Sequence, residues 1–192
     1  MKTKFITLTA ITLISLSAQA AFVGIHSAAA AGDVDRLKEY LAKDPTLISA
    51  RNGPNRTPLC IAAMRGQTNA VEFLITHGAD VNDKGFFELT PLGDMAMYGM
   101  TNDQRCAGIA TILLAHGAEV NPMDGYGATP LLHAVEMRKS QLARVLLEHG
   151  ATQTLTYKGA NSGTTPLHMA IGYGDKDMVA ALLEFNPPLT TK

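Results

Sequence analysis

The chain has 192 residues, of which 46% are apolar, 17% are charged and 6% are aromatic. This length and apolar content are enough for one domain with a continuous hydrophobic core. The formal net charge of −1 gives no electrostatic reason to expect a nucleic acid or an anionic membrane as partner.

The first twenty residues have the organisation of a secretory signal peptide. Lys2 and Lys4 supply positive charge, residues 5–16 are mostly apolar, and residues 18–20 read Ala-Gln-Ala, a typical cleavage site. A transmembrane anchor is the alternative, but about twelve mixed residues fall short of the roughly 20 that span a bilayer. We expect cleavage near Ala20 and Ala21, and a single mature domain over residues 21–192 in an oxidising compartment such as the bacterial periplasm.

One pattern recurs along the rest of the chain. The triplet Thr-Pro-Leu begins at Thr57, Thr90, Thr129 and Thr165. Thr before Pro predicts a helix start, because the hydroxyl accepts from a free N–H and Pro gives up a donor that had no partner. Three second helices end in His-Gly-Ala, with the His at His77, His116 and His149. There Gly suits a left-handed cap and the imidazole can bond the last carbonyls.

This pattern resembles the ankyrin repeat, and the resemblance covers essentially all of residues 21–192. It implies an all-α solenoid of helix-turn-helix units joined by short β-hairpin-like fingers, in an exported bacterial protein of about five repeats. The expected repeats span residues 22–52, 55–85, 86–125, 126–158 and 163–192. The first lacks the triplet and the last ends with Pro187-Pro188, so we expect these two to cap the stack.

Three irregularities interrupt the pattern. Six additional residues within 100–107 are expected to lie in the turn between the two helices of the third repeat. Arg138 stands where Gly is usual, so we expect that turn to adopt another backbone conformation. A longer connection, 152–164, contains Tyr157 and Lys158 and precedes the last repeat. We expect this connection and the insertion to form surface loops suited to contacts with a partner.

The sequence offers little catalytic chemistry. It contains no HExxH, GxSxG or CxxC motif and no phosphate-binding loop, so we expect neither an enzyme nor a cofactor. His133 and Glu136 share a helix face, which keeps a metal-binding or catalytic site as a weaker alternative. Cys60 and Cys106 are expected to stay unpaired, Cys60 in the core and Cys106 in a loop, with a disulfide between them as the alternative. For His168 the resemblance implies a hydrogen bond between neighbouring repeats.

The resemblance also implies that partners dock on the concave face, through the fingers and the helix positions seven and eight residues after each Thr. Those positions are mostly apolar here, as is typical of a protein-binding hot spot. The expected binding residues are Met64, Arg65, Phe86, Phe87, Met97, Tyr98, Tyr126, Glu136, Met137 and Tyr173. The alternative is that some of these side chains pack within the stack. Phe87 and Leu89 could cover neighbouring fingers, and Met97 could be buried by the insertion.

We therefore expect an exported, monomeric, non-enzymatic module that binds another envelope protein, without nucleic acid and without membrane insertion after signal cleavage. A small binder of this kind resembles an immunity or inhibitor protein that blocks a periplasmic hydrolase. The alternative is an accessory scaffold that stabilises a periplasmic enzyme. The nine methionines are compatible with protection of such an enzyme against oxidants.

Overall fold

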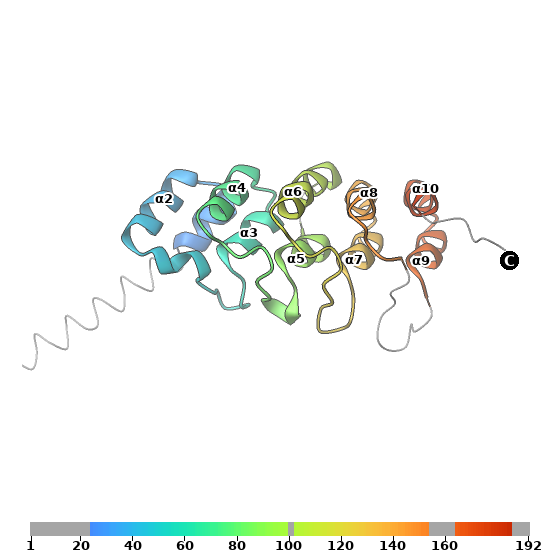
Figure 1. Cartoon of the computed structure of the whole chain (residues 1–192), viewed down its shortest axis with the longest axis horizontal. Coiled ribbons are helices and arrows are strands. Elements are labelled where there is room, and N and C mark those ends of the chain that lie inside the picture. The colour runs from blue at the N-terminus through green and yellow to red at the C-terminus, as the bar shows by residue number, and fades with distance from the viewer. Residues whose placement is uncertain (1–23, 100–101, 154–163, 186–192) are drawn as a thin grey trace, which may run out of the picture.

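The computed structural model describes residues 24–99, 102–153 and 164–185. Within these ranges the chain is helical and contains no β-strand. The helices stack side by side along one long axis (Figure 1). The predicted helical solenoid is therefore confirmed. The predicted signal peptide 1–20, its cleavage site, Tyr157, Lys158 and Pro187-Pro188 lie outside the described residues.

Each unit of the stack pairs a shorter inner helix with an outer helix. Residues 24–31 are helical and precede α2 (Val34–Lys43) and the short 3-10 helix η1 (Pro45–Ser49). The later elements are α3 (Pro58–Met64), α4 (Thr68–Thr76), η2 (Phe86–Glu88), α5 (Pro91–Tyr98), α6 (Asp103–Ala115), α7 (Pro130–Glu136), α8 (Ser140–Glu148), α9 (Pro166–Gly172) and α10 (Lys176–Glu184). In Figure 1, α4, α6, α8 and α10 form the upper row, and the loops that precede α5 and α7 project below these helices. None of the helices in the described part of the chain is long and apolar enough to cross a membrane.

The Thr-Pro-Leu triplets begin the inner helices, as predicted. Each Thr hydroxyl accepts a hydrogen bond from the backbone N–H three residues later, at 3.3 to 3.4 Å. Such a cap is typically worth about 1 kcal/mol. At the start of α9 the cap is reciprocal, because His168 Nδ1 accepts from the Thr165 N–H at 3.3 Å. The bonds found for the His168 ring thus lie within its own unit, not between units.

The His-Gly-Ala ends also behave as predicted. The Nδ1 atoms of His77, His116 and His149 lie 2.8 to 2.9 Å from the carbonyl oxygen four residues earlier. The following glycines, Gly78, Gly117 and Gly150, have φ values of 92°, 86° and 87°. A side chain in that left-handed conformation would be strained, which explains the glycine.

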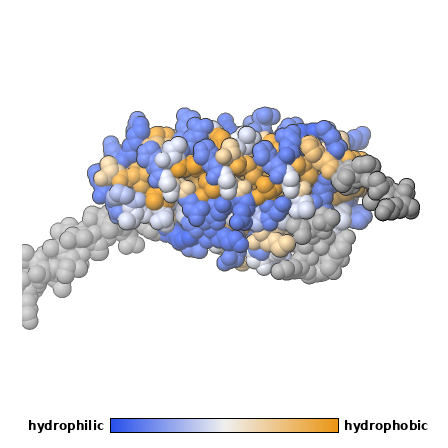
Figure 2. All heavy atoms as spheres, viewed as in Figure 1, coloured by the Kyte–Doolittle hydropathy of each residue, from blue (hydrophilic) through white to orange (hydrophobic). Residues whose placement is uncertain are grey.

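A single hydrophobic core runs through the stack. It is built from the facing sides of consecutive helices and is rich in Leu and Ala, the small residue that lets helices approach closely. The first unit contributes the buried residues Ile25, Ala29 and Leu37 although it lacks the triplet. Figure 2 shows apolar residues gathered in a band along the length of the face it presents, between hydrophilic margins.

The insertion in the third unit lengthens a helix, so the prediction that all of it lies in a turn is wrong. Helix α6 has 13 residues, whereas α4 and α8 have nine each. It starts early because Asn102 caps it, accepting from the Arg105 N–H at 2.9 Å. Cys106 is consequently a buried residue of α6 and not a loop residue, and Cys60 is buried in α3 as predicted.

The longer α6 also supplies a missing cap to its neighbour. Helix α8 has no side-chain cap of its own. The Asp103 carboxylate fills this role, accepting from the N–H groups of Gln141 at 2.6 Å and Leu142 at 2.9 Å. A carboxylate at a helix N-terminus is favoured both by hydrogen bonding and by the helix dipole.

Arg138 adopts the conformation normally reserved for glycine, so the prediction of a different turn is wrong. Its φ is 55°, close to the 72° of Gly66 and the 64° of Gly174 at equivalent turns. A left-handed conformation costs a residue with a Cβ roughly 1 kcal/mol. The ion pair from Arg138 Nε to Asp175 at 3.4 Å is more than half exposed on the arginine side and contributes little against that cost.

The Arg138→Gly variant is therefore expected to be more stable than the wild type by about 0.5 kcal/mol, because relief of strain outweighs the lost ion pair and the greater freedom of the unfolded chain. Urea unfolding followed by circular dichroism measures this difference. Arg138→Ala, which removes the ion pair but keeps a Cβ, serves as the control and should not gain stability. Equal stability of both variants would show that the turn is not strained.

Candidate protein-binding site

Three of the loops between units fold into fingers, which we define as residues 52–56, 85–89 and 124–128. Each finger is closed by one backbone hydrogen bond of 3.0 Å, from Asn52 N–H to Arg56 O, from Gly85 N–H to Leu89 O and from Asp124 N–H to Ala128 O. Each closure resembles that of a β-hairpin, but the segments that it joins are too short to form β-strands. The predicted fingers are thus present as tight turns.

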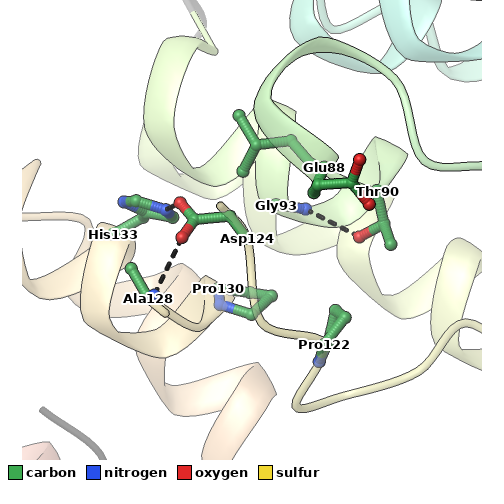
Figure 3. Close-up of a pocket in the computed structure, with 9 residues that line it drawn as sticks. Glu88, Thr90, Gly93, Pro122, Asp124, Ala128, Pro130 and His133 are labelled. Atoms are coloured by element: carbon green, nitrogen blue, oxygen red, sulfur yellow. Dashed lines mark hydrogen bonds and ion pairs between the residues drawn. The ribbon is translucent and has the colours of Figure 1, made fainter. Parts of the chain in front are cut away.

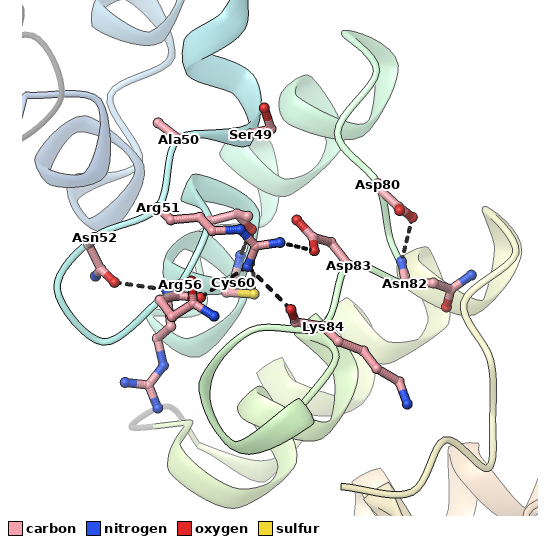
Figure 4. Close-up of polar contacts among 12 residues, drawn as sticks. Ser49, Ala50, Arg51, Asn52, Arg56, Cys60, Asp80, Asn82, Asp83 and Lys84 are labelled. Carbon is pink, nitrogen blue, oxygen red and sulfur yellow. Dashed lines mark hydrogen bonds and ion pairs between the residues drawn. The ribbon is translucent and has the colours of Figure 1, made fainter. Parts of the chain in front are cut away.

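The fingers are tied to one another. The Arg51 guanidinium pairs with Asp83 and donates to the Lys84 carbonyl at 3.2 Å, which joins the segments that lead into the first and second fingers (Figure 4). The second and third are joined by a bond of 2.9 Å from the Gly125 N–H to the Phe87 carbonyl. Side chains on these fingers are therefore presented in a fixed register along the solenoid.

The second finger carries backbone strain. Phe87 and Glu88 have φ values of 51° and 61°, so two consecutive residues with a Cβ are left-handed. Each costs roughly 1 kcal/mol and persists only because the surroundings enforce it. The enforcing contacts are the bond to Gly125 and the burial of Leu89, which is 2% exposed. As a result, the ring of Phe87 is held 47% exposed. Strain of this kind is typical of functional segments.

Four aromatic rings lie in series on the second and third fingers and α5. Phe86 contacts Phe87 at 4.4 Å between ring centroids and Tyr98 at 6.1 Å, and Phe87 contacts Tyr126 at 5.3 Å. We call Phe86, Phe87, Tyr98 and Tyr126 the aromatic ladder. These separations fall in the favourable range for aromatic pairs. Phe87 and Tyr126, at the outer end, are 47% and 49% exposed.

A charged pair supports the inner end of the ladder. The Arg56 guanidinium donates to Asp94 through Nε at 2.6 Å and Nη2 at 2.8 Å. Its Cζ lies 4.6 Å from the centroid of the Phe86 ring and 5.1 Å from that of Tyr98. In Figure 4 this guanidinium points away from the Arg51 contacts. The arginine, from the first finger, therefore fixes rings that belong to the next unit.

The pair is unusual because Asp94 is buried. The side chain is only 1% exposed, against 11% for that of Arg56. Burial raises the pKa of the Asp94 carboxyl, and the hydrogen bonds from Arg56 oppose that rise. The same hydrogen bonds raise the pKa of Arg56. A buried pair of this kind contributes little net stability to a fold. Its clearest effect here is the fixed position of the guanidinium beneath the two rings.

The third finger is held by a second buried polar cluster. His133 Nε2 lies 2.8 Å from Asp124 Oδ2, and each of these side chains is 1% exposed. Asp124 Oδ1 accepts from the backbone N–H groups of Tyr126 at 2.9 Å and Ala128 at 2.8 Å. Figure 3 shows the carboxylate between the imidazole and the finger backbone. The finger that carries Tyr126 is thus anchored to α7.

His133 and Glu136 are close but form no obvious metal centre. His133 Nδ1 lies 3.5 Å from Glu136 Oε2 and is buried without a hydrogen bond. His133 Nε2 is engaged by Asp124. Among the described residues there is no group of three or more His, Cys, Asp or Glu side chains that could hold a metal ion. The geometry instead suits anchoring of the finger.

The structure brings together only part of the predicted binding set. Phe86, Phe87, Tyr98 and Tyr126 form the ladder. The others lie at the C-terminal ends of the inner helices: Met64 and Met97 are half-buried, Arg65 is exposed, Glu136 is half-buried beside His133, and Met137 and Tyr173 are 45% and 47% exposed. No ring contact places Tyr173 within the ladder among the described aromatic pairs.

The predicted set omitted the side chains that hold the ladder. Arg56 directly precedes Thr57, a finger position, and its side chain could have been included on that ground. Asp94 was detectable as a carboxylate within the apolar stretch of an inner helix, where a buried charge requires a partner. Asp124, which anchors the third finger, carries no such signal, because acidic residues are common in turns.

Comparison with known proteins gives a consistent result. The family described as ankyrin repeats in three copies matches residues 25–124 and 96–191. The human transient receptor potential cation channel subfamily A member 1 is 30% identical over 164 residues, which are 84% of this chain and 14% of the channel. Human ankyrin repeat and SOCS box protein 6 is 34% identical over 139 residues, 67% of this chain and 32% of the relative. A putative ankyrin repeat protein of fowlpox virus is 31% identical over 132 residues, 67% of this chain and 37% of the relative. The chain thus spans a third or less of the length of the first two.

Proposed function

Because the chain belongs to the ankyrin-repeat family, whose repeats form protein–protein interaction modules, we propose that it binds a partner protein through the aromatic ladder. The observation that carries this proposal is the support given to two half-exposed rings. Phe87 sits on a strained finger and Tyr126 on a finger anchored by buried Asp124. A rigid, exposed aromatic surface loses little entropy on binding, which is characteristic of hot spots.

The size of the effect follows from the exposed area of the rings. Large aromatic side chains bury about 150–250 Å² each, so covering the exposed half of one removes roughly 100 Å² from water. At about 25 cal/mol per Å² this contributes about 2 kcal/mol for each ring. Phe87 and Tyr126 together would then account for a factor of about 10³ in affinity.

We further propose that the protein acts in the cell envelope as a non-enzymatic, monomeric binder. The signal-peptide pattern of residues 1–20 supports this location. An inhibitor or immunity protein that blocks a periplasmic hydrolase fits a small domain whose rigid fingers can enter a cleft. An accessory scaffold that stabilises a periplasmic enzyme is the alternative. The two differ in what happens to the partner: the first lowers its activity and the second prolongs it.

The experiment compares the proteins captured from a periplasmic extract by the mature wild type and by the Phe87→Ala/Tyr126→Ala variant. The control is Ile171→Ala/Leu183→Ala, which removes two large apolar side chains that are 59% and 54% exposed at the far end of the stack. Circular dichroism verifies that both variants fold. The proposal predicts one protein captured by the wild type and the control and lost by the ladder variant. Capture of the same protein by all three would overturn it.

The activity of the captured protein then separates inhibitor from scaffold. If it is an envelope hydrolase, adding the wild type should lower its rate and adding the ladder variant should not. A rate that is unchanged at first and decays more slowly on incubation would identify a scaffold. A partner that is found only outside the envelope would contradict the proposed location.

A further inference from the structure

The last unit of the stack carries an apolar groove. Ile171 and Leu183 are 59% and 54% exposed, and with Val179 they line a groove of about 440 Å³ on α9 and α10. Figure 1 shows these two helices at the end of the stack. We propose that the segment that follows α10, residues 186–192, folds back over this groove and covers it with the side chain of Leu189.

The inner-helix side of the groove is a face on which the other units stack. Ile171 stands six residues after Thr165, and the equivalent residues Ala63, Ala96 and Val135 are at most 1% exposed. They are buried because each of the inner helices α3, α5 and α7 packs against the inner helix of the following unit. Ile171 thus presents a side chain of the stacking face, larger than its equivalents, to the outside.

The outer helix shows the same difference. Leu183 in α10 and Leu147 in α8 are each the second leucine of a Leu-Leu-Glu sequence, 18 residues after the Thr of their unit. Leu147 is 5% exposed, whereas Leu183 is 54% exposed. A terminal unit of a solenoid needs a polar outer face for solubility. The described part of the last unit lacks such a face along this groove, so a cover from elsewhere is needed.

The composition of residues 186–192 suits such a cover. This segment, Asn-Pro-Pro-Leu-Thr-Thr-Lys, lies outside the described residues and contains one large aliphatic side chain, Leu189. Pro187-Pro188 disfavours a helix and favours the extended polyproline II conformation, whose backbone groups stay hydrated. The two prolines also limit the entropy that the segment loses when it is held in place. The segment can therefore cover the groove with Leu189 while its polar side chains face water.

The length of the segment matches that of the groove. Leu183 in the last turn of α10 and Lys176 in its first turn both line the groove. The nine residues of α10 span about 14 Å at about 1.5 Å per residue. At about 3.1 Å per extended residue, residues 186–189 reach about 12 Å, which brings Leu189 back to the middle of α10, beside Val179. Residues 190–192 then extend to the first turn.

A tethered segment is favoured over a second copy of the chain. A lasting contact between two proteins buries about 1,000 Å² or more in total, and three partly exposed apolar side chains provide only a fraction of that area. The segment that follows Phe185 is already held beside the groove, so its effective concentration there is high without any loss of translational freedom.

The test uses the full-length mature protein with ¹³C-labelled methyl groups of Ile, Leu and Val. The proposal predicts nuclear Overhauser effects from the methyl groups of Leu189 to those of Ile171, Val179 and Leu183, and these should persist unchanged on dilution. Their absence would overturn the proposal. Effects that vanish on dilution, or that join differently labelled chains in a mixed sample, would show that a second copy occupies the groove and would overturn it as well.

Hydrogen exchange provides a second readout with a matched pair of variants. Leu189→Asp should speed exchange of the α10 amides about fivefold, as expected when a leucine side chain loses roughly half of the stabilisation of full burial. Thr191→Asp adds the same charge two residues further along the segment and should leave exchange unchanged. Equal exchange rates in the two variants would count against the cover, because its effect would then not depend on Leu189.

This inference and the proposed function can fail separately. The groove lies on α9 and α10, whereas the ladder lies on α5 and the second and third fingers, so Leu189→Asp should capture the same partner as the wild type. If the ladder variant also captures that partner while the Leu189 contacts are observed, the proposed function is wrong and the cover stands. Loss of capture in Ile171→Ala/Leu183→Ala would show that the partner occupies the groove, and the inference would be wrong.

Discussion

The Asp94→Asn variant should unfold with a free energy about 3 kcal/mol below that of the wild type. The substitution keeps the shape of the side chain but leaves the guanidinium of Arg56, 11% exposed, without its anion. Removing one partner of a buried ion pair typically costs about 3–5 kcal/mol, and the partial exposure of Arg56 places this case at the lower end. Urea unfolding followed by circular dichroism measures the loss.

The control is the double variant Arg56→Met/Asp94→Leu, which removes both charges and keeps apolar volume. It should lose less stability than Asp94→Asn alone, because no charge is left unpaired. It should nevertheless weaken partner binding, since Phe86 and Tyr98 lose the guanidinium that fixes them. A double variant as unstable as the single one would show that the pair contributes net stability. A double variant that binds the partner as well as the wild type would contradict the role of the pair as a support of the ladder.

Lys139→Met is the second substitution with a large expected effect, a loss of about 2–3 kcal/mol. The Lys139 ammonium donates to the carbonyls of Met95 at 3.1 Å, Ala96 at 3.0 Å and Gly99 at 3.1 Å. Lys139 belongs to the next unit and thereby supplies hydrogen-bond donors to the carbonyl groups at the C-terminal end of α5. Burial lowers the pKa of Lys139, as expected of an ammonium removed from water. The Met95 carbonyl keeps the hydrogen bond from the Gly99 N–H at 2.8 Å, so the loss comes from the carbonyls of Ala96 and Gly99. An unpaired buried acceptor costs about 1–3 kcal/mol, which water at the half-buried Gly99 would reduce.

Lys176→Met provides the matched control, because Lys176 is an exposed lysine at the start of α10. Its loss should change the free energy of unfolding by less than about 0.5 kcal/mol. Hydrogen exchange offers a second readout: the amides of α5 should lose protection in Lys139→Met and keep it in Lys176→Met. Unchanged stability and protection in Lys139→Met would mean that water replaces the ammonium without cost.

Local features of this fold could be predicted from the sequence, because their causes lie within a few residues. Thr57 and its equivalents cap the helix that follows them, and His77 bonds the carbonyl four residues back. These contacts need only the helix itself. The position of the insertion could not be predicted in the same way. Its residues are compatible with a longer turn and with an early start of α6, and the structure adopts the early start, capped by Asn102.

The remaining features depend on how units stack. Arg138 accepts a strained φ of 55°, and no sequence rule states when the surrounding packing will enforce strain. The Arg56 to Asp94 pair joins residues 38 positions apart, so it appears only once the units are in register. The exposure of Phe87 could not be predicted from the sequence either. Phe87 is exposed and Leu89 is buried because Phe87 and Glu88 adopt left-handed conformations in this finger.

The measurement that tests the central claim most directly is the dissociation constant of the captured partner for three proteins, determined by isothermal titration calorimetry. These are the wild type, Phe87→Ala/Tyr126→Ala and the control Ile171→Ala/Leu183→Ala. If the ladder carries binding, the ladder variant should bind at least about 100-fold more weakly, a loss of roughly 3 kcal/mol, and the control should match the wild type. A ladder variant that binds within threefold of the wild type would contradict the account.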